Sequence, residues 1–265
     1  MLEQELKVAK QAVREAGKTI LRIAEEHYST AAKHADRTVV TKADIEADRI
    51  LQHYLGGEFP EYGWLSEETK DDDRRFDCER VWIVDPMDGT REFVMKVPEF
   101  VVSVALADNC DIVLSVILNP CTGELFEAVR GAGAKLNGQQ IHCDHQLDGK
   151  PKVEVSRSDI EKNRFAGYER HLELHPCGSI AYKLARLADG QADSTLSVTP
   201  KNEWDIAGGV ILVTEAGGQV TDLAGNKHRF SQADTLVDGV IAASTDAYAI
   251  IKSAVDERRI RIAPK

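Results

Sequence analysis

The chain has 265 residues, 43% of them hydrophobic, and its 44 acidic and 33 basic side chains give a net charge of −11. That length allows one large domain or two lobes, and the acidic balance argues against a generic nucleic-acid or membrane-surface binder, since both need a basic face. The charged N-terminus MLEQELKVAK has no secretion signal, no stretch has the roughly 18 apolar residues of a membrane span, and the five cysteines include no C-x-x-C pair, so we expect a cytoplasmic protein with reduced thiols.

Two helices are predicted at the start of the chain. Apolar residues from Leu2 to Ile23 recur every three or four positions, which predicts an amphipathic helix. HADRTVV is then expected to form a loop or short strand. Thr41 with Asp44 has the spacing of a capping box and predicts the start of a second helix, which GGEFPEYG ends. The charge run DDDRRFDCER predicts an exposed loop.

The central and C-terminal segments predict two different arrangements. VWIVD, FVVSVALA, DIVLSVIL and ELFEAVR are rich in Val, Ile and Leu and predict an antiparallel meander. Later strands VEVSRS, GQVTDLAGN and GVIAAS alternate with helices SIAYKLARLADG, DIAGGVILVTEAGG and DAYAIIKSAVDER, as in α/β folds. We therefore predict an N-terminal α+β lobe over residues 1–148 and a C-terminal α/β lobe over residues 149–265.

The segment VWIVDPMDGTREF carries the main functional signal. An apolar strand that ends in Asp85 places a carboxylate at a sheet edge, where ligands of α/β folds bind. Pro86 bends the chain so that Asp88 returns beside Asp85, and Gly89 allows a ligand to approach the backbone. Thr90 is a candidate helix N-cap whose hydroxyl can face an anion. Two carboxylates so close need a cation, and oxygen ligands without His or Cys favour Mg²⁺ over Zn²⁺.

Turn formation explains D-P and D-G singly, but the whole string D-P-x-D-G-T after a buried strand favours a metal site. Three other acids can complete it. Glu67 stands beside Glu68 in WLSEET, where paired acids also indicate a solvated loop. Asp205 precedes a helix rich in small residues, where an acid is also a routine cap. Helix capping is also the alternative role for Asp44, because it is the acid of the predicted capping box.

These motifs resemble those of the inositol monophosphatase superfamily, the magnesium-dependent, lithium-sensitive phosphatases. The resemblance runs through VVTKAD, LSEE, WIVDPMDGT, GELFEAVRGAGAKLNG and WDIAGGVILVTEAGG, in that order. It implies an α/β (α+β) fold, a two-lobed layered αβαβα sandwich of the sugar phosphatase type, with the site between the lobes. It also implies two or three Mg²⁺ ions per site. The implied activity is hydrolysis of a small phosphate monoester by a metal-activated water.

The resemblance assigns a role to each candidate residue. The implied metal ligands are Glu67, Asp85, Met87 through its backbone carbonyl, Asp88 and Asp205. The implied catalytic residues are Glu67 and Thr90, which would activate the water, and Asp44, near a third and weaker metal. The implied substrate-binding residues are Asp88, Gly89, Thr90, Ser179, Lys183 and Asp205. The intact set of acids favours an enzyme over a non-catalytic binding protein with the same fold.

The substrate prediction depends on the residues around these motifs. Inositol monophosphatases follow D-G-T with one residue and then Asn-Phe, whereas this chain has Arg91, Glu92 and Phe93. DGTREF and LSEE are more similar to the CysQ-like 3′(2′),5′-bisphosphate nucleotidase branch. That branch tends to carry a lysine at the position of Lys183, which would meet a second phosphate. On spacing alone, Lys183 is equally a solvated helix residue.

The residues before the W-D motif match neither branch. The arginine of the nucleotidases and the acid of the inositol phosphatases are both missing, and Lys201 is a candidate substitute for the arginine. We predict hydrolysis of adenosine 3′,5′-bisphosphate to AMP and phosphate. Inositol-1-monophosphatase and fructose-1,6-bisphosphatase-like activities are the alternatives. We expect a small phosphorylated substrate and no nucleic-acid or membrane partner, with a homodimer as one alternative for the assembly.

Two His and Cys clusters are also present. They are His142, Cys143 and His145, and His171, His175 and Cys177. A zinc site needs four well-placed ligands, and both clusters lie outside the motifs of the predicted site. We therefore do not predict zinc binding.

Overall fold

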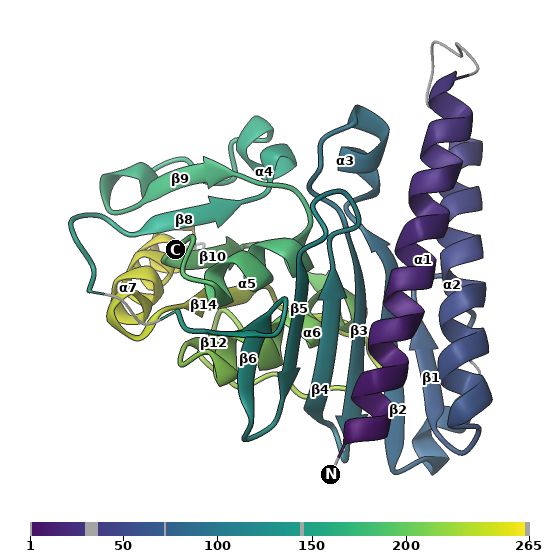
Figure 1. Ribbon diagram of the computed structural model, residues 1–265. Coiled ribbons are helices and arrows are strands. Elements are labelled where there is room, and N and C mark those ends of the chain that lie inside the picture. Colours follow the sequence, from purple (N-terminus) through teal and green to yellow (C-terminus); the bar gives the residue numbers. More distant parts are fainter. Residues whose placement is uncertain (1, 30–36, 72, 144–145, 263–265) are drawn as a thin grey trace.

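The first sheet carries most of the candidate residues. In the computed structural model, which describes residues 2–29, 37–71, 73–143 and 146–262, its seven strands are neighbours in chain order (Figure 1). The first pair is parallel and the others are antiparallel. This confirms the predicted antiparallel meander, which β6 and β7 extend, and β1 adds a parallel strand at its edge. The strands are β1 (Gly63–Ser66), β2 (Arg80–Asp88), β3 (Val101–Asp108), β4 (Asp111–Leu118), β5 (Leu125–Val129), β6 (Gly133–Leu136) and β7 (Gln139–Ile141).

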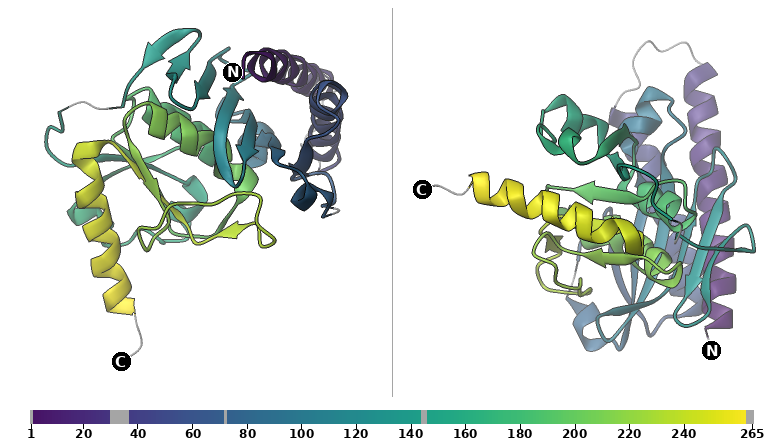
Figure 2. Two further views of the ribbon diagram at one scale, coloured as in Figure 1. Left: turned by 90° about the horizontal axis from the view of Figure 1, so that it is seen from below. Right: turned by 90° about the vertical axis from the view of Figure 1, so that its left-hand side faces the viewer.

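Helices cover both faces of this sheet (Figures 1 and 2). α1 (Glu3–Ser29) and α2 (Arg37–Glu58) pack on one face, and α5 (Ile180–Ala188) and α6 (Glu203–Glu215) pack on the other. A second sheet, in the order β12-β14-β10-β8-β9, lies beyond α5 and α6, and α7 (Thr245–Ile262) packs on its outer face. The layers therefore follow the predicted αβαβα order.

Shorter elements complete the described chain. The strands of the second half are β8 (Lys152–Val155), β9 (Glu173–Pro176), β10 (Ser194–Ser197), β11 (Lys201–Asn202), β12 (Gln219–Thr221), β13 (Leu236–Val237) and β14 (Val240–Ala243). The short helices are η1 (Arg74–Asp77), α3 (Thr90–Met95), α4 (Arg157–Glu161) and η2 (Tyr168–Arg170). The first large sheet ends at Ile141 and the second begins at Lys152, on either side of the position near residue 148 where a lobe boundary was expected. Residues from both sides of that position share one hydrophobic cluster.

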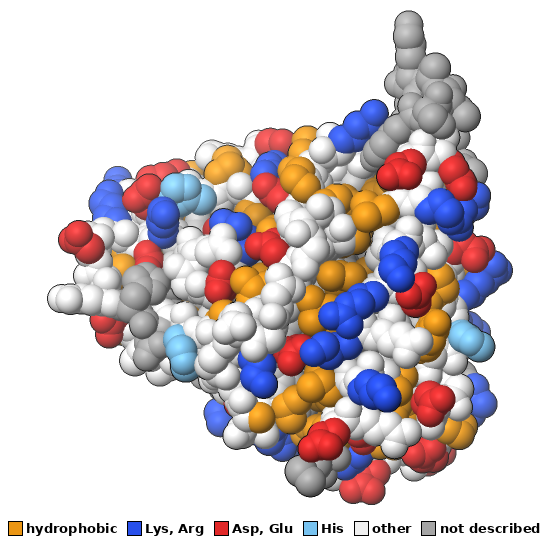
Figure 3. Space-filling view, in the orientation of Figure 1, with side chains coloured by type: hydrophobic (Ala, Val, Ile, Leu, Met, Phe, Trp, Pro, Cys, Tyr) orange, Lys and Arg blue, Asp and Glu red, His pale blue; other side chains and the backbone are white. Residues whose placement is uncertain are grey.

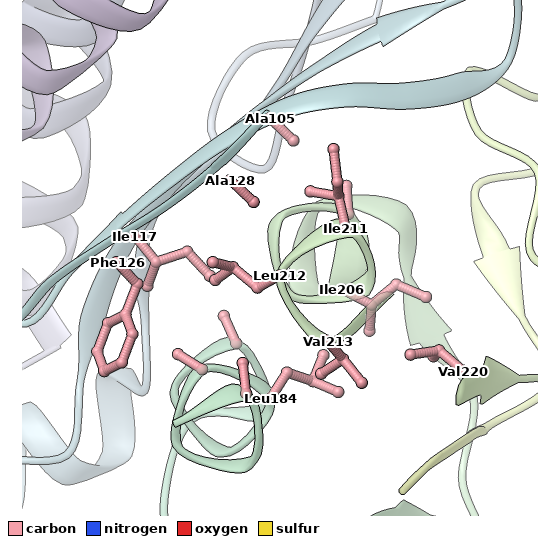
Figure 4. Close-up of a cluster of buried hydrophobic side chains, with 14 of the residues drawn as sticks. Ala105, Ile117, Phe126, Ala128, Leu184, Ile206, Ile211, Leu212, Val213 and Val220 are labelled. Carbon is pink, nitrogen blue, oxygen red and sulfur yellow. The ribbon is translucent and has the colours of Figure 1, made fainter. Parts of the chain in front are cut away.

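Alternation along the strands explains the layers. Val102 and Val104 of β3 pack with α1 and α2, whereas Val101 packs toward α5 and α6. Successive side chains of a strand point to opposite faces, so a strand that is apolar throughout must be covered on both sides. Figure 4 shows the middle cluster, where α5 and α6 contribute Leu184 and Leu212.

Two predicted segments differ from the structure. α2 begins at Arg37, so Thr41 lies inside the helix and does not cap it, and the end of the predicted HADRTVV loop is helical. The charge run is not simply exposed, because Arg75 of η1 is buried. Its guanidinium donates to Ser231 Oγ (3.0 Å) and to the Gln232 carbonyl (2.7 Å). A buried arginine needs such acceptors, and only tertiary folding brings them to it.

A β-bulge places Asp85 and Asp88 on the same face of the first sheet. Asp85 pairs with Ser103 and Asp88 with Val101, so three steps on β2 oppose two on β3. In a regular strand, residues three apart point to opposite faces. The extra residue returns Asp88 to the face of Asp85, and Pro86 is tolerated in this irregular part of the ladder.

Gly89 makes the tight connection from β2 to α3. Its φ is 102°, and an added Cβ would lie 2.8 Å from the Glu99 carbonyl oxygen. Both features require glycine at this position. Gly89, and not Thr90 as predicted, is the N-cap residue of α3, and Thr90 is the first residue of the helix.

Two adjacent glycines allow α6 to lie close to its neighbours. An added Cβ on Gly208 would lie 2.8 Å from Ser103 Oγ of the first sheet, and one on Gly209 would lie 2.4 Å from Leu184 Cβ of α5. This packing brings the first turn of α6, which carries Asp205, against the first sheet.

We expect Gly209→Ala to destabilise the protein by about 1–3 kcal/mol, because the new methyl group overlaps a packed side chain. Urea denaturation measures this change. Gly57→Ala is the matched control, since nothing lies within 4 Å of its added Cβ in α2, and it should be neutral or stabilising. Equal stability of the Gly209→Ala and wild-type proteins would show that α6 does not need this close approach.

Candidate active site

Four predicted carboxylates converge from three parts of the chain. Glu67 follows β1, Asp85 and Asp88 lie in β2, and Asp205 lies in the first turn of α6. The parallel pairing of β1 with β2 brings Glu67 level with the end of β2, where the Glu67 N–H donates to the Val84 carbonyl (3.3 Å). The charges of Asp88, Glu67 and Asp205 all act on Asp85.

Burial and mutual repulsion raise the pKa of these carboxyls. Burial raises the pKa of Asp85 well above its usual range, and the neighbouring carboxylates add to the rise. Burial and the charge of Asp88 raise the pKa of Asp205 to about 7. Burial, then the charges of Asp205 and Asp88, also raise the pKa of Glu67 to about 7. Because the Glu67 side chain is exposed, water screens part of this last effect.

Protein donors hold one oxygen of Asp88 and one of Asp205. Asp88 Oδ2 accepts hydrogen bonds from Ser179 Oγ (2.6 Å) and the Ala181 N–H (2.7 Å). Asp205 Oδ2 accepts one from the Asn202 N–H (2.9 Å), as part of a capping box. Asp205 is therefore both the capping acid of α6 and a member of the carboxylate group.

Asp85 is the least satisfied member of the group. Its Oδ1 accepts from the Met87 N–H (3.0 Å), but its Oδ2 is buried and receives no hydrogen bond from a protein donor. Glu67 lies beside Asp85, and two carboxyl groups can form a hydrogen bond to each other only if one of them is protonated. If both are ionised, a cation must lie between them to offset their repulsion.

The donor set fits Mg²⁺. Its side-chain ligands are all carboxylate oxygens, which hard cations prefer, and the buried Asp85 Oδ2 has no other partner. Within the described residues, no three His, Cys, Asp or Glu side chains already stand at metal-binding distances. Like charges remain apart unless a cation compensates their repulsion, so the carboxylates would have to move together on binding.

Asp44 lies beside this group, on α2. It is only 5% exposed, and burial, together with the charges of Glu68 and Glu67, raises its pKa to about 8. Asp48, one helical turn further on, was not among the predicted residues. It accepts from Ser66 Oγ (2.5 Å) and so holds the segment that carries Glu67. Its spacing from Asp44 places both on one face of α2, which is the signal that could have identified it.

A cavity of about 240 Å³ opens beside Asp88 and Asp205. The predicted residues Gly89, Thr90 and Ser179 line it. Both halves of the chain therefore contribute to its walls. Sequence reasoning missed the lining residues Ser156, Ile180, Leu196 and Ser197.

Lys183 lines the same cavity, yet it is only 3% exposed. The solvated alternative for this lysine is therefore wrong. Its ammonium donates to the carbonyls of Ser179 (3.0 Å), Cys177 (3.3 Å) and Gly178 (3.4 Å). Burial lowers the pKa of Lys183. The lysine thus has a structural function at the start of α5, whatever else it binds.

The structure also locates Met87 and most members of the two His and Cys clusters. The Met87 side chain is buried with α1 and α2. His145 lies outside the described residues, and the other members of the two His and Cys clusters form no metal-binding group. None of the five cysteines, which all lie within the described residues, forms a disulfide. In the part of the chain that the structure describes, no helix has the length and apolar character needed to cross a membrane.

Comparison with known proteins identifies the family. The sequence profile of the inositol monophosphatase family matches residues 1–262. The inositol-1-monophosphatase of Rhizobium meliloti is 34% identical over 239 residues, covering 83% of this chain and 86% of that protein. The Nus factor SuhB of Escherichia coli K12 is 28% identical over 248 residues, covering 88% and 90%.

The solved structures agree with these relatives. CysQ from Bacteroides thetaiotaomicron, a bacterial member of the inositol monophosphatase family, superposes with a TM-score of 0.76 at 29% identity, covering 91% of this chain and 97% of that chain. Family members are hydrolases of phosphate monoesters and are generally metal-dependent. The chain therefore belongs to the inositol monophosphatase family.

Proposed function

We propose that this phosphatase is a Mg²⁺-dependent 3′(2′),5′-bisphosphate nucleotidase. The observation that carries the metal-dependent part is the carboxylate group of Glu67, Asp85, Asp88 and Asp205 beside a small cavity, with one buried Asp85 oxygen that lacks a donor. Such a site is costly without a cation and supports binding of an anionic ester once cations are present.

The chain's own residues account for binding and orientation. Bound Mg²⁺ supplies charge neutralisation for the phosphate and a lower pKa for water. Glu67 is exposed at the edge of the group and would accept a proton from water. Thr90 and Gly89 present the start of α3 to the cavity. Asp44 would extend the carboxylate group toward Glu68 and hold a weaker third ion.

Positive side chains around the cavity support a substrate with a second phosphate. Arg91, Lys183 and Lys201 all line it. The charge of Lys201 acts on Asp205 and offsets part of the rise in the pKa of that carboxyl, which supports Lys201 as the substitute for the nucleotidase arginine. The likeness to CysQ is consistent with this substrate class. The relative named inositol-1-monophosphatase keeps inositol 1-phosphate as the alternative.

Phosphate release from three substrates at fixed Mg²⁺ tests the proposal. We expect adenosine 3′,5′-bisphosphate to have a kcat/KM at least about tenfold above inositol 1-phosphate and fructose 1,6-bisphosphate, which corresponds to about 1.4 kcal/mol from one charged contact. Lys201→Met should remove most of this preference. Lys70→Met, at an exposed position, is the control. A higher kcat/KM for inositol 1-phosphate would reject the nucleotidase and retain the phosphatase.

Other expectations stay proposals. On the face in Figure 3, acidic and basic side chains are interspersed, and with the net charge of −11 this supports a small-molecule substrate and no nucleic-acid partner. Because the Escherichia coli relative is named a Nus factor, RNA binding should be measured as well, and we expect none. Lithium inhibition, a cytoplasmic location and a homodimer remain predictions.

A further inference from the structure

A strained turn before α5 holds the proposed metal ligand Asp88. Ser179 has φ 46° and ψ 122°, a combination that residues other than glycine rarely adopt. In this conformation its hydroxyl reaches Asp88 Oδ2 (2.6 Å), and the Ala181 N–H reaches the same oxygen (2.7 Å). Both contacts span the two halves of the chain. Such strain persists only where surrounding contacts enforce it.

Glu99 supplies one of those contacts. Its Oε2 accepts a hydrogen bond from the Gly178 N–H (2.6 Å), directly before the strained residue. Arg157, at the start of α4, binds Glu99 with both terminal guanidinium nitrogens, and Nη2 lies 2.7 Å from Oε1. A bidentate pair fixes the carboxylate orientation more firmly than a single contact. Glu92 adds a second carboxylate, 3.6 Å from Arg157.

The turn is confined on its other sides as well. An added Cβ on Gly178 would lie 2.2 Å from Glu92 Cγ, so the backbone passes directly against that side chain. Lys183 binds the carbonyls of Cys177, Gly178 and Ser179 from within α5. Glu99, in the segment after α3, thus accepts from an N–H of the turn, and Lys183 of α5 donates to its carbonyl groups. Arg157 of α4 acts on the turn only through Glu99.

We propose that Glu99 and Arg157 are positioning residues for metal binding, acting through Gly178 and Ser179 on Asp88. The inference rests on the proposed Mg²⁺-dependent function. With Oδ2 occupied by Ser179 and Ala181, the Asp88 carboxylate has one defined orientation and directs Oδ1 to a cation. Without Glu99 the turn can relax, the Ser179 hydroxyl moves away, and Asp88 loses that orientation. Residues that orient metal ligands commonly change metal affinity without touching the metal.

Mn²⁺ binding, followed by the loss of the free-ion signal in electron paramagnetic resonance, tests this directly. We expect Glu99→Ala to raise the Mn²⁺ dissociation constant by about tenfold. Glu99→Gln keeps an oxygen for the Gly178 N–H but loses the bidentate pair with Arg157, so it should raise the constant severalfold, to a value between wild type and Glu99→Ala. In activity assays the Glu99→Ala defect should appear as a higher Mg²⁺ requirement, with kcat largely restored at saturating Mg²⁺.

Glu161→Gln is the matched control. It removes the exposed Arg91–Glu161 ion pair, which also links α3 to α4 but does not touch the 178–179 turn. Its Mn²⁺ dissociation constant should match wild type. If Glu99→Ala does not fold, Arg157→Lys removes the bidentate geometry and should raise the constant severalfold.

The outcomes separate the two proposals. If folded Glu99→Ala and Arg157→Lys bind Mn²⁺ with the same affinity as wild type, the positioning role is overturned and the proposed function is retained. A lower melting temperature with unchanged Mn²⁺ affinity does the same, because it indicates structural support only. An equal defect in Glu161→Gln would assign the effect to loosening of α4. Wild-type protein that binds no divalent cation overturns the proposed function and this inference together.

Discussion

Asp88→Asn is expected to lower kcat/KM by about a thousandfold or more, a loss of about 4 kcal/mol of transition-state stabilisation. Asparagine has nearly the same shape, and its carbonyl oxygen can still accept the hydrogen bonds from Ser179 and Ala181. The variant therefore keeps the contacts between the two halves of the chain. It removes a negative charge that a divalent cation requires.

The stability of this variant gives an independent readout. Without metal, Asp88→Asn should melt at a higher temperature than wild type near pH 8, because one member of a mutually repelling group has become neutral. Added Mg²⁺ should stabilise wild type and have little effect on the variant. Asp77→Asn, at an exposed position of η1, is the control for loss of a surface charge. Wild-type turnover in Asp88→Asn would reject the carboxylate group as the catalytic centre.

Removal of divalent cations is expected to abolish activity and to make stability strongly dependent on pH. Folding raises the pKa of Asp44 from 3.8 to about 8 and that of Asp205 from 3.8 to about 7. The metal-free native state therefore binds protons more tightly than the unfolded chain. The stability associated with these carboxyls is fully present below about pH 4 and is lost as pH rises through their folded pKa values.

Melting curves with a chelator and with saturating Mg²⁺ measure this effect. From pH 5 to pH 8 the metal-free protein should lose roughly 4–8 °C, the shift expected for about 2 kcal/mol in a chain of this size. With Mg²⁺ the loss should disappear, because metal binding requires deprotonated carboxylates and strengthens as pH rises. Asp44→Asn should reduce the slope of the metal-free protein. Parallel curves with and without Mg²⁺ would contradict cation binding at this group.

Sequence patterns identified the elements that carry the site. The helical period of α1 and the apolar strands of the meander follow from side-chain spacing, because burial of one helix face or both sheet faces depends on local order of residues. The D-P-x-D-G-T string and the W-D motif likewise marked Asp85, Asp88 and Asp205 as acids at element ends. Asp88 ends β2 and Asp205 lies in the first turn of α6, but Asp85 lies inside β2, which continues to Asp88 and does not end at Asp85 as predicted.

Local patterns were less reliable where a residue had two roles. Thr41 and Asp44 have capping-box spacing, but α2 continues past them toward the N-terminus. Lys183 and Arg75 belong to residue types that are usually exposed, yet both are buried among carbonyl and carboxylate acceptors. Charged residues can be buried only when distant partners satisfy them, and a sequence does not show which partners will be near.

The sequence by itself determined the kinds of ligands, their order and the layered arrangement, since these depend on composition and short-range periodicity. Only the tertiary structure decided two other features. One is the bulge that turns Asp85 and Asp88 to one face of the sheet, and the other is the hydrogen bond to Asp88 from the strained Ser179, which lies 91 positions further along the chain. Such contacts arise from packing whole elements together, because one oxygen's direction depends on the relative placement of two sheets and the helices between them.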